Sequence, residues 1–214
     1  MKISDHSHMI IGTLLLLVCV YYYFNALQKD ELLIESFEGK IGVDTLDYGS
    51  SPGSTIAVSP SSKISKCGRQ ALEINYDLRP RGYVYCAKGY DLYHRTDITT
   101  WGGGRAGWRV QPDGIAWGKY EAFSIYLRGI GIGKVAVDLT DNGGEMWRYT
   151  VNVGSRGWKK YTISFDDLSS RMDWQPPSAV VNKYIDYPFK SFQIEPKEPG
   201  MGTLYVDCAK FVEL

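Results

Sequence analysis

The segment at residues 134–151, KVAVDLTDNGGEMWRYTV, decides the fold class of this 214-residue chain. Its first half alternates in polarity, with Val135, Val137 and Leu139 on one side and Asp138 and Thr140 on the other. A period of two residues is typical of a half-buried β-strand. The DNGG sequence that follows supplies residues able to adopt positive φ, as a tight hairpin requires. The segment therefore predicts two antiparallel strands joined by a hairpin.

Strand character continues along almost the whole chain after residue 28. Gly, Pro, Asn and Asp interrupt it at short intervals, and no stretch keeps a 3.6-residue apolar period for three turns. We therefore expect one all-β domain built of two packed sheets. The predicted strands are residues 32–37, 71–78, 83–90, 120–128, 134–140, 145–153, 158–165, 190–196 and 203–212. RPRG at residues 79–82 predicts a further hairpin, and the Ser-, Gly- and Pro-rich residues 44–66 predict a long loop with a short strand near residues 56–58.

Alternation also indicates which side chains face the core. These are Phe123, Ile125, Leu127, Val135, Val137, Leu139, Tyr161, Ile163, Phe165, Phe192 and Ile194. The opposite faces combine aromatic rings with charged and amide groups, a mixture that suits sugars and that is also enriched at protein interfaces. The predicted ligand or partner face consists of Tyr126, Arg128, Asp138, Thr140, Glu145, Trp147, Gln193 and Glu195. Trp101 and Trp108 flank a Gly-rich loop, and we expect them either to line the rim of the ligand site or simply to pack.

Composition narrows the classes of partner. The 24 acidic and 24 basic residues leave no net charge, so no global field attracts nucleic acid. Aromatic residues make up 14% of the chain, with 16 Tyr and 6 Trp, which is typical of β-sandwiches and of sugar-binding ones in particular. The domain has an odd number of cysteines, Cys67, Cys86 and Cys208, at spacings that match no zinc pattern. One disulfide with a free thiol and three buried thiols both remain open.

Several short motifs in order resemble a known family. They are IESFEG at residues 34–39, YEAFSIYLRG at 120–129, GWKK at 157–160 and GTLYVD at 202–207. Together they resemble the jelly-roll carbohydrate-binding modules of the galactose-binding-like class, especially the family 11 type, over residues 32–214. FDDLSSR at 165–171, WQP at 174–176 and SFQIEP at 191–196 resemble most the related domain of mitochondrial complex I assembly factors.

The resemblance implies a jelly-roll β-sandwich with a concave ligand face and no catalysis. It also implies a structural calcium ion near the meeting point of the first and last strands. The matching positions are Glu38 and Asp207, whose carboxylates are the hard oxygen donors that calcium requires, although both can equally be ordinary surface acids. We expect no other cofactor.

Three catalytic interpretations find little support in the residues themselves. The GIGIGK segment at 129–134 lacks the four-residue spacing of a phosphate-binding loop and joins two strands, which favours a Gly-rich hairpin. Only His94 lies in the domain as a near-neutral base, since His6 and His8 precede the apolar segment. Paired carboxylates such as Asp138 and Glu145 are better suited to binding beside an aromatic ring than to hydrolysis. We therefore expect no enzyme activity.

The N-terminal region predicts a membrane anchor. Residues 9–27, MIIGTLLLLVCVYYYFNAL, contain no charge and form roughly 28 Å of helix, enough to cross a bilayer. The expected division is a tail at 1–8, a transmembrane helix at 9–27, a linker at 28–31 and the binding domain at 32–214. The anchor's main residues are Leu14, Leu15, Leu16 and Leu17, followed by an aromatic belt of Tyr21, Tyr22, Tyr23 and Phe24.

A cleaved secretory signal and a lipidated Cys19 are the alternatives to this anchor. The apolar run is longer than a usual signal core, and Phe24 is bulky at the −3 position of the cleavage candidate after Ala26. Val18, rather than a small residue, precedes Cys19. The short leading tail favours a cytoplasmic N-terminus and an exported domain.

Two functions from different classes fit this organisation. The anchor favours an accessory or scaffolding subunit of a larger membrane complex, with integral membrane proteins and lipid as partners. By analogy with the assembly factors, that complex would be respiratory or photosynthetic. The alternative is a membrane-tethered carbohydrate-binding module that recognises a glycan on its aromatic face. Nucleic acid is not an expected partner of either.

Overall fold

The computed structural model describes residues 29–90, 108–154 and 157–214. The chain divides into two compact units, residues 1–30 and 31–214, and all of the described strands lie in the second. The predicted anchor at residues 9–27 lies outside the described residues. Within the described ranges, no helix has the length and hydropathy needed to cross a membrane.

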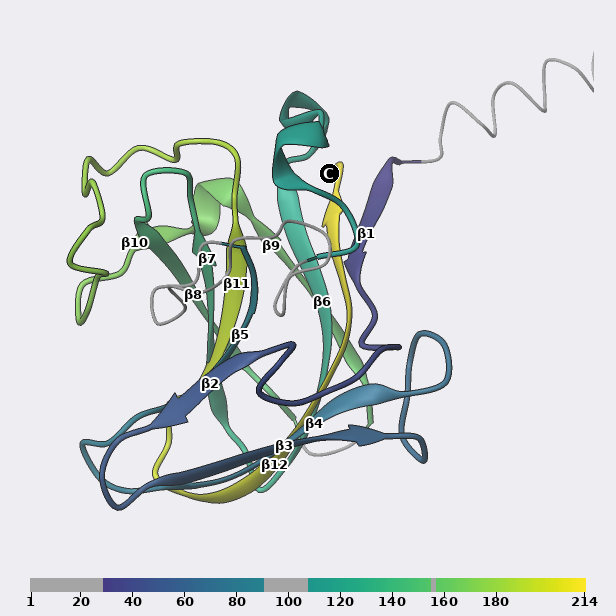
Figure 1. Cartoon of the computed structure of the whole chain (residues 1–214), viewed down its shortest axis with the longest axis vertical. Coiled ribbons are helices and arrows are strands. Elements are labelled where there is room, and N and C mark those ends of the chain that lie inside the picture. Colours follow the sequence, from purple (N-terminus) through teal and green to yellow (C-terminus); the bar gives the residue numbers. More distant parts are fainter. Residues whose placement is uncertain (1–28, 91–107, 155–156) are drawn as a thin grey trace, which may run out of the picture. The chain divides into compact units, whose positions relative to one another are not determined.

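The second unit is an all-β sandwich of two six-stranded antiparallel sheets, as predicted (Figure 1). In sheet A the strand order is β3-β4-β12-β6-β9, and β1 also pairs with β12. Its strands are β1 (Glu31–Glu35), β3 (Thr55–Ser61), β4 (Ala71–Leu78), β6 (Ala122–Ile130), β9 (Lys159–Ser164) and β12 (Gly200–Val212). In sheet B the order is β10-β8-β7-β11-β5-β2. Its strands are β2 (Asp47–Ser50), β5 (Val84–Gly89), β7 (Lys134–Thr140), β8 (Met146–Asn152), β10 (Ser169–Ser170) and β11 (Ser191–Pro196).

In the described ranges, three short 3₁₀ helices connect the strands: η1 (Pro112–Gly114), η2 (Trp117–Lys119) and η3 (Phe165–Asp167). The η3 helix begins after Ser164, whose hydroxyl accepts a hydrogen bond from the backbone N–H of Asp166 at 3.3 Å. This side chain satisfies one of the free N–H groups at a helix start.

The core lies between the two sheets and includes the predicted alternating residues. Phe123, Ile125 and Leu127 of β6 are fully buried, as are Val135, Val137 and Leu139 of β7. On β11, Phe192 packs against Phe123 with ring centroids 5.4 Å apart, which joins the two sheets. Each such side chain contributes about 1.5–3 kcal/mol through burial. The core-facing positions read from the sequence are thus confirmed.

Strand positions follow the sequence closely, but two of the three predicted turns connect different sheets. Residues 141–145 join β7 to β8 within sheet B as a true hairpin. Residues 131–133 instead carry the chain from β6 in sheet A to β7 in sheet B, and residues 79–83 carry it from β4 to β5. The prediction of hairpins at these two turns was wrong, because a Gly- or Pro-rich turn fixes a chain reversal without fixing the strand's partner.

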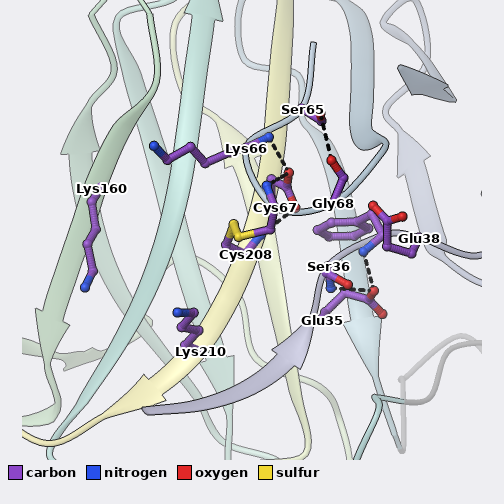
Figure 2. The surroundings of a disulfide bond; sticks show 12 residues. Glu35, Ser36, Glu38, Ser65, Lys66, Cys67, Gly68, Lys160, Cys208 and Lys210 are labelled. Atoms are coloured by element: carbon purple, nitrogen blue, oxygen red, sulfur yellow. Dashed lines mark hydrogen bonds between the residues drawn. A yellow bond between two sulfur atoms is a disulfide. The ribbon is translucent and has the colours of Figure 1, made fainter. Parts of the chain in front are cut away.

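Cys67 and Cys208 form a disulfide, so the first of the two alternatives left open by the sequence, one disulfide with a free thiol, is correct. Figure 2 shows Cys67 reaching Cys208 of β12 from the loop that also carries Ser65, Lys66 and Gly68. The bond closes a sequence separation of 141 residues. Cys86 is a buried free thiol, and burial raises its pKa.

Candidate functional site

A cavity of about 590 Å³ opens on the outer face of sheet B. Its volume falls in the usual range for small-molecule sites. Strands β5, β7 and β11 supply its floor, and the loops before β5 and after β10 supply its walls. The lining residues are Asp47, Arg81, Gly82, Tyr83, Tyr85, Ala87, Thr140, Gly144, Met146, Arg171, Asp173, Trp174, Pro176, Ser178, Ser191, Gln193, Glu195 and Lys197.

Strand register explains which side chains reach the cavity. One row of opposed residues crosses sheet B in the order Asp47, Ala87, Gln193, Asp138 and Arg148. Directly opposed residues share a face of the sheet. Neighbouring positions on the same strands face the core, so this row lies on the outer side.

An ion-pair cluster stabilises the floor of the cavity. Arg148 donates two hydrogen bonds to the fully buried Asp138 carboxylate, at 2.7 and 2.8 Å. Its guanidinium also donates to Glu195, while Arg171 contacts Asp138 at 3.2 Å and Glu195 at 3.1 Å. Removing one partner would leave a buried charge without compensation, which is strongly destabilising. We therefore expect the cluster to hold these side chains in place.

Asp173 closes the cluster towards solvent. Its carboxylate contacts Arg171 at 2.6 Å and Arg148 at 3.0 Å, and Lys197 lies 3.5 Å away. Burial acts to raise the pKa of Asp173. The hydrogen bond from Arg171 and the three positive charges outweigh burial, so that pKa lies well below its ordinary value.

Aromatic side chains from opposite edges of sheet B border the cavity. Tyr83 and Tyr85 come from the β5 side, and Trp174 comes from the opposite side. The exposed fractions are 48% for Tyr83 and 39% for Trp174. Burial raises the pKa of Tyr85, whose hydroxyl lies 3.4 Å from Asp47. The Arg171 guanidinium lies 5.5 Å from the centre of the Trp174 ring, in a cation–π contact that holds the ring in place.

The predicted ligand face is only partly brought together at this cavity. Thr140, Gln193 and Glu195 line it, and Asp138 lies beneath it in the ion-pair cluster. Glu145 does not reach the surface. It is fully buried, and its carboxylate accepts backbone hydrogen bonds from Asn182 and Lys183, so it fastens a loop.

Trp147 packs in the core, and this corrects its predicted place on the outer face. It is only 6% exposed, and its indole N–H donates to Asp141 at 3.0 Å. Across the five-residue turn, Trp147 is paired with the core residue Leu139, and Asp138 is paired with Arg148. A shift of one residue in register moves every side chain of a strand to the other face.

Tyr126 and Arg128 lie on the outer face of the other sheet, away from the predicted site. They belong to β6 of sheet A, where Tyr126 is paired with Asp207 and Arg128 with Tyr205. The Lys66 ammonium lies 5.0 Å from the centre of the Tyr126 ring. Their placement follows from the turn at residues 131–133, which changes sheets between β6 and β7.

The two predicted rim residues have different outcomes. Trp108 is 4% exposed in the core, where its indole N–H donates to the carbonyl of Lys88 at 3.1 Å. It therefore packs inside the domain and does not border the cavity. Trp101 lies outside the described residues.

Sequence reasoning missed most of the cavity wall: Tyr83, Tyr85, Arg171, Asp173 and Trp174. In the sequence, the segment that carries the last three indicates only a family resemblance. A loop has no periodicity, so its side chains cannot be assigned to a face from sequence alone. The one available signal was Trp174 next to Asp173 and three residues after Arg171.

The carboxylates predicted to hold calcium are engaged by backbone N–H groups. Asp207 accepts hydrogen bonds from Lys66 and Cys67, each at 2.8 Å, and Glu38 accepts one from Arg69 at 2.8 Å. Hydrogen bonds from Gln70 and Arg69 lower the pKa of Glu38, and burial raises that of Asp207. N–H donors that point at both carboxylates do not favour a cation there, and calcium binding stays a prediction.

Comparisons with known proteins agree with this architecture. The sequence matches the carbohydrate-binding domain of family 11 over residues 26–212. Among curated protein sequences, none matches the chain. The comparisons do not show the predicted relation to complex I assembly factors.

Similar solved structures include the family 11 carbohydrate-binding module of a cellulosomal cellulase from Clostridium thermocellum. It has 19% identity and a TM-score of 0.64, and 87% of this chain and 96% of that chain are covered. The family 11 module of the same organism in complex with a β-1,3-1,4-mixed-linked tetrasaccharide has 19% identity and a TM-score of 0.61, with coverage of 86% and 95%. A family 30 carbohydrate-binding module has 10% identity and a TM-score of 0.53, with coverage of 86% and 88%. At these identities the structures establish the fold, and with the sequence match over residues 26–212 the chain belongs to the family 11 carbohydrate-binding domains.

Proposed function

We propose that the domain is a non-catalytic carbohydrate-binding module whose glycan lies in the cavity on sheet B. The observation that carries the proposal is the cavity's wall, in which Tyr83 and Trp174 border a polar floor from opposite edges of the sheet. Aromatic rings can stack on the apolar faces of sugar rings. Gln193 and Arg171 offer hydrogen-bonding groups for the hydroxyls between them.

The charge of the cavity favours a neutral glycan. Its described lining holds three acids and three bases: Asp47, Asp173, Glu195, Arg81, Arg171 and Lys197. Arg171 forms ion pairs with Asp173 and Glu195, and Lys197 forms an ion pair with Glu195. A uronic-acid chain would have to compete with these carboxylates for the same cations. A neutral chain needs only hydrogen bonds.

The family assignment supports the carbohydrate-binding alternative better than the scaffolding subunit predicted from the anchor. A related module has been solved with a β-1,3-1,4-mixed-linked tetrasaccharide, which gives a suitable probe. Isothermal titration calorimetry of the full chain should detect binding of this tetrasaccharide and no binding of an oligogalacturonide. Binding of the acidic oligosaccharide alone would contradict the proposed neutral ligand, and binding of neither would count against this probe class.

We further propose that residues 9–27 anchor the module in a membrane and that the domain lies on the exported side. The support is the uncharged apolar run and the Cys67–Cys208 disulfide, since disulfides persist mainly in oxidising compartments. Protease treatment of intact cells and of inside-out vesicles tests this topology. The proposal requires cleavage of the domain in the first and protection in the second.

A further inference from the structure

The loop between β10 and β11 holds four exposed apolar side chains close together in sequence. Val180, Val181, Tyr184 and Tyr187 have exposed fractions of 61%, 51%, 76% and 44%. Single exposed apolar residues are ordinary on protein surfaces, whereas a cluster of them indicates an interaction surface. We call residues 180–187 the apolar loop.

The apolar loop is fastened to the β7–β8 hairpin by hydrogen bonds. The backbone N–H groups of Asn182 and Lys183 donate to the buried Glu145 carboxylate at 3.0 and 3.1 Å. The Val180 N–H donates to the carbonyl of Gly143 at 2.9 Å, and that of Asp186 donates to the Asp141 carboxylate at 3.2 Å. The fold therefore holds these apolar side chains outward.

Ring contacts place the apolar loop at the end of the sandwich where β1 begins. Leu32 of β1 is paired with Phe211 of β12, and the Trp117 ring lies 4.7 Å from the Phe211 ring. Tyr187 stacks on Trp117 at 5.5 Å. The beginning of β1 and the C-terminal end of β12 lie side by side at this end (Figure 1).

The chain enters the domain at the same end. Only four steps separate Leu27, the last residue of the predicted anchor, from Glu31 at the start of β1, a reach of at most roughly 14 Å. The headgroup layer on each side of a bilayer is roughly 5–8 Å thick. An anchor at residues 9–27 would therefore keep Glu31, at the start of β1, within this reach of the end of the anchor.

We infer that the apolar loop rests on the surface of the lipid bilayer, an inference that depends on the proposed anchor. Tyrosine and small apolar side chains suit the boundary between headgroups and hydrocarbon. Within residues 180–187, Lys183 and Asp186 balance in charge, so the loop itself carries no net charge that would draw it to acidic lipid. We therefore expect the loop to contact neutral lipid, and we expect salt not to weaken this contact.

This contact would also place the glycan cavity close to the membrane. Ser178, two residues before Val180, lines the cavity, and Gly144 lines it from the hairpin that fastens the loop. A glycan bound there would lie near the lipid surface.

Fluorescent labels on the full chain in phosphatidylcholine vesicles test the inference. In a Cys19→Ser background, one label is attached at Tyr184→Cys and a control label at Met201→Cys. Met201 is 78% exposed and lies at the other end of β12, up to roughly 36 Å of strand from Val212. The measurement is repeated with the label at Val181→Cys, to show that the result does not depend on replacing Tyr184.

Quenching by lipid that carries a nitroxide near the headgroup should be at least about threefold stronger at position 184 than at 201. It should persist when the ionic strength is raised to about 1 M. Equal quenching at both positions of chains that float with the vesicles would overturn the inference and leave the anchor intact. Chains that do not float with vesicles overturn the anchor and this inference together. Tetrasaccharide binding in calorimetry reports separately on the module.

Discussion

At the scale of single residues, two tryptophans on the sheet B side of the domain have opposite roles. Trp147 fills the core and donates a hydrogen bond to Asp141, while Trp174 stands at the cavity wall above Arg171. Both look alike in the sequence, since each adjoins a charged residue, Arg148 in the first case and Asp173 in the second. Only the burial of the first and the exposure of the second separate packing from binding.

Replacing Trp174 with alanine should weaken oligosaccharide binding at least about tenfold, the loss of roughly 1.4 kcal/mol expected when a stacking ring is removed. The ring is 39% exposed, so we expect little change in the free energy of unfolding. Titration calorimetry with the tetrasaccharide and urea unfolding measure the two effects. The matched control is Tyr184→Ala, an exposed aromatic outside the cavity lining, which should bind as the wild type does. Equal weakening in both variants would remove Trp174 from the site.

Asp173 should make the stability of the domain depend on pH. Its pKa lies below the ordinary value of about 4, so the ionised carboxylate stabilises the folded state above that pH. The contribution is lost as the pH falls through the lower pKa of the folded state. Asp173→Asn should therefore be less stable than the wild type at neutral pH, and the difference should shrink below about pH 4.

Urea unfolding as a function of pH measures this difference. Asp113→Asn, which changes an exposed acid on η1, serves as the control and should track the wild type. A difference for Asp173→Asn that grows as the pH falls would contradict the ion-pair account.

At the scale of strands and loops, the sequence was a good guide to strand positions and a poor one to their partners. All nine predicted strands are present, because period-two alternation and turn residues act locally. Strands β2 (Asp47–Ser50) and β10 (Ser169–Ser170) were missed, since four and two residues are too short to show alternation. The β3 strand (Thr55–Ser61) is longer than the predicted three residues.

The face of a strand is harder to predict than its position. Adjacent apolar residues Met146 and Trp147 leave the alternation of β8 ambiguous, and the turn length decided which of them faces the core. Tyr126 was misplaced because the turn after β6 changes sheets. Thr140, Gln193 and Glu195 were found because their strands alternate cleanly.

The Cys67–Cys208 disulfide should stabilise the domain by about 2–4 kcal/mol, since it closes a long loop in the unfolded chain. The variant Cys67→Ser/Cys208→Ala should lose this amount in urea unfolding. A reductant should destabilise the wild type and leave the variant unchanged. Glycan affinity should be retained, because the disulfide belongs to sheet A and the cavity to sheet B. A variant as stable as the wild type would show that the bond contributes nothing.

At the scale of the whole described domain, the two outer faces of the sandwich differ in chemistry. Sheet B has a cavity with aromatic walls over an ion-pair cluster, whereas on the outer face of sheet A the disulfide-linked loop places Lys66 over Tyr126. The first offers a cavity to a neutral chain, whereas on the second the Tyr126 ring is already in contact with the protein's own Lys66. This asymmetry is the basis for assigning glycan binding to sheet B.

A crystal structure of the domain with the β-1,3-1,4-mixed-linked tetrasaccharide tests that assignment most directly. The account predicts sugar rings in the sheet B cavity, between Tyr83 and Trp174, with hydroxyl groups within hydrogen-bonding distance of Gln193. Sugar bound on the outer face of sheet A, against Tyr126 and Arg128, would contradict it.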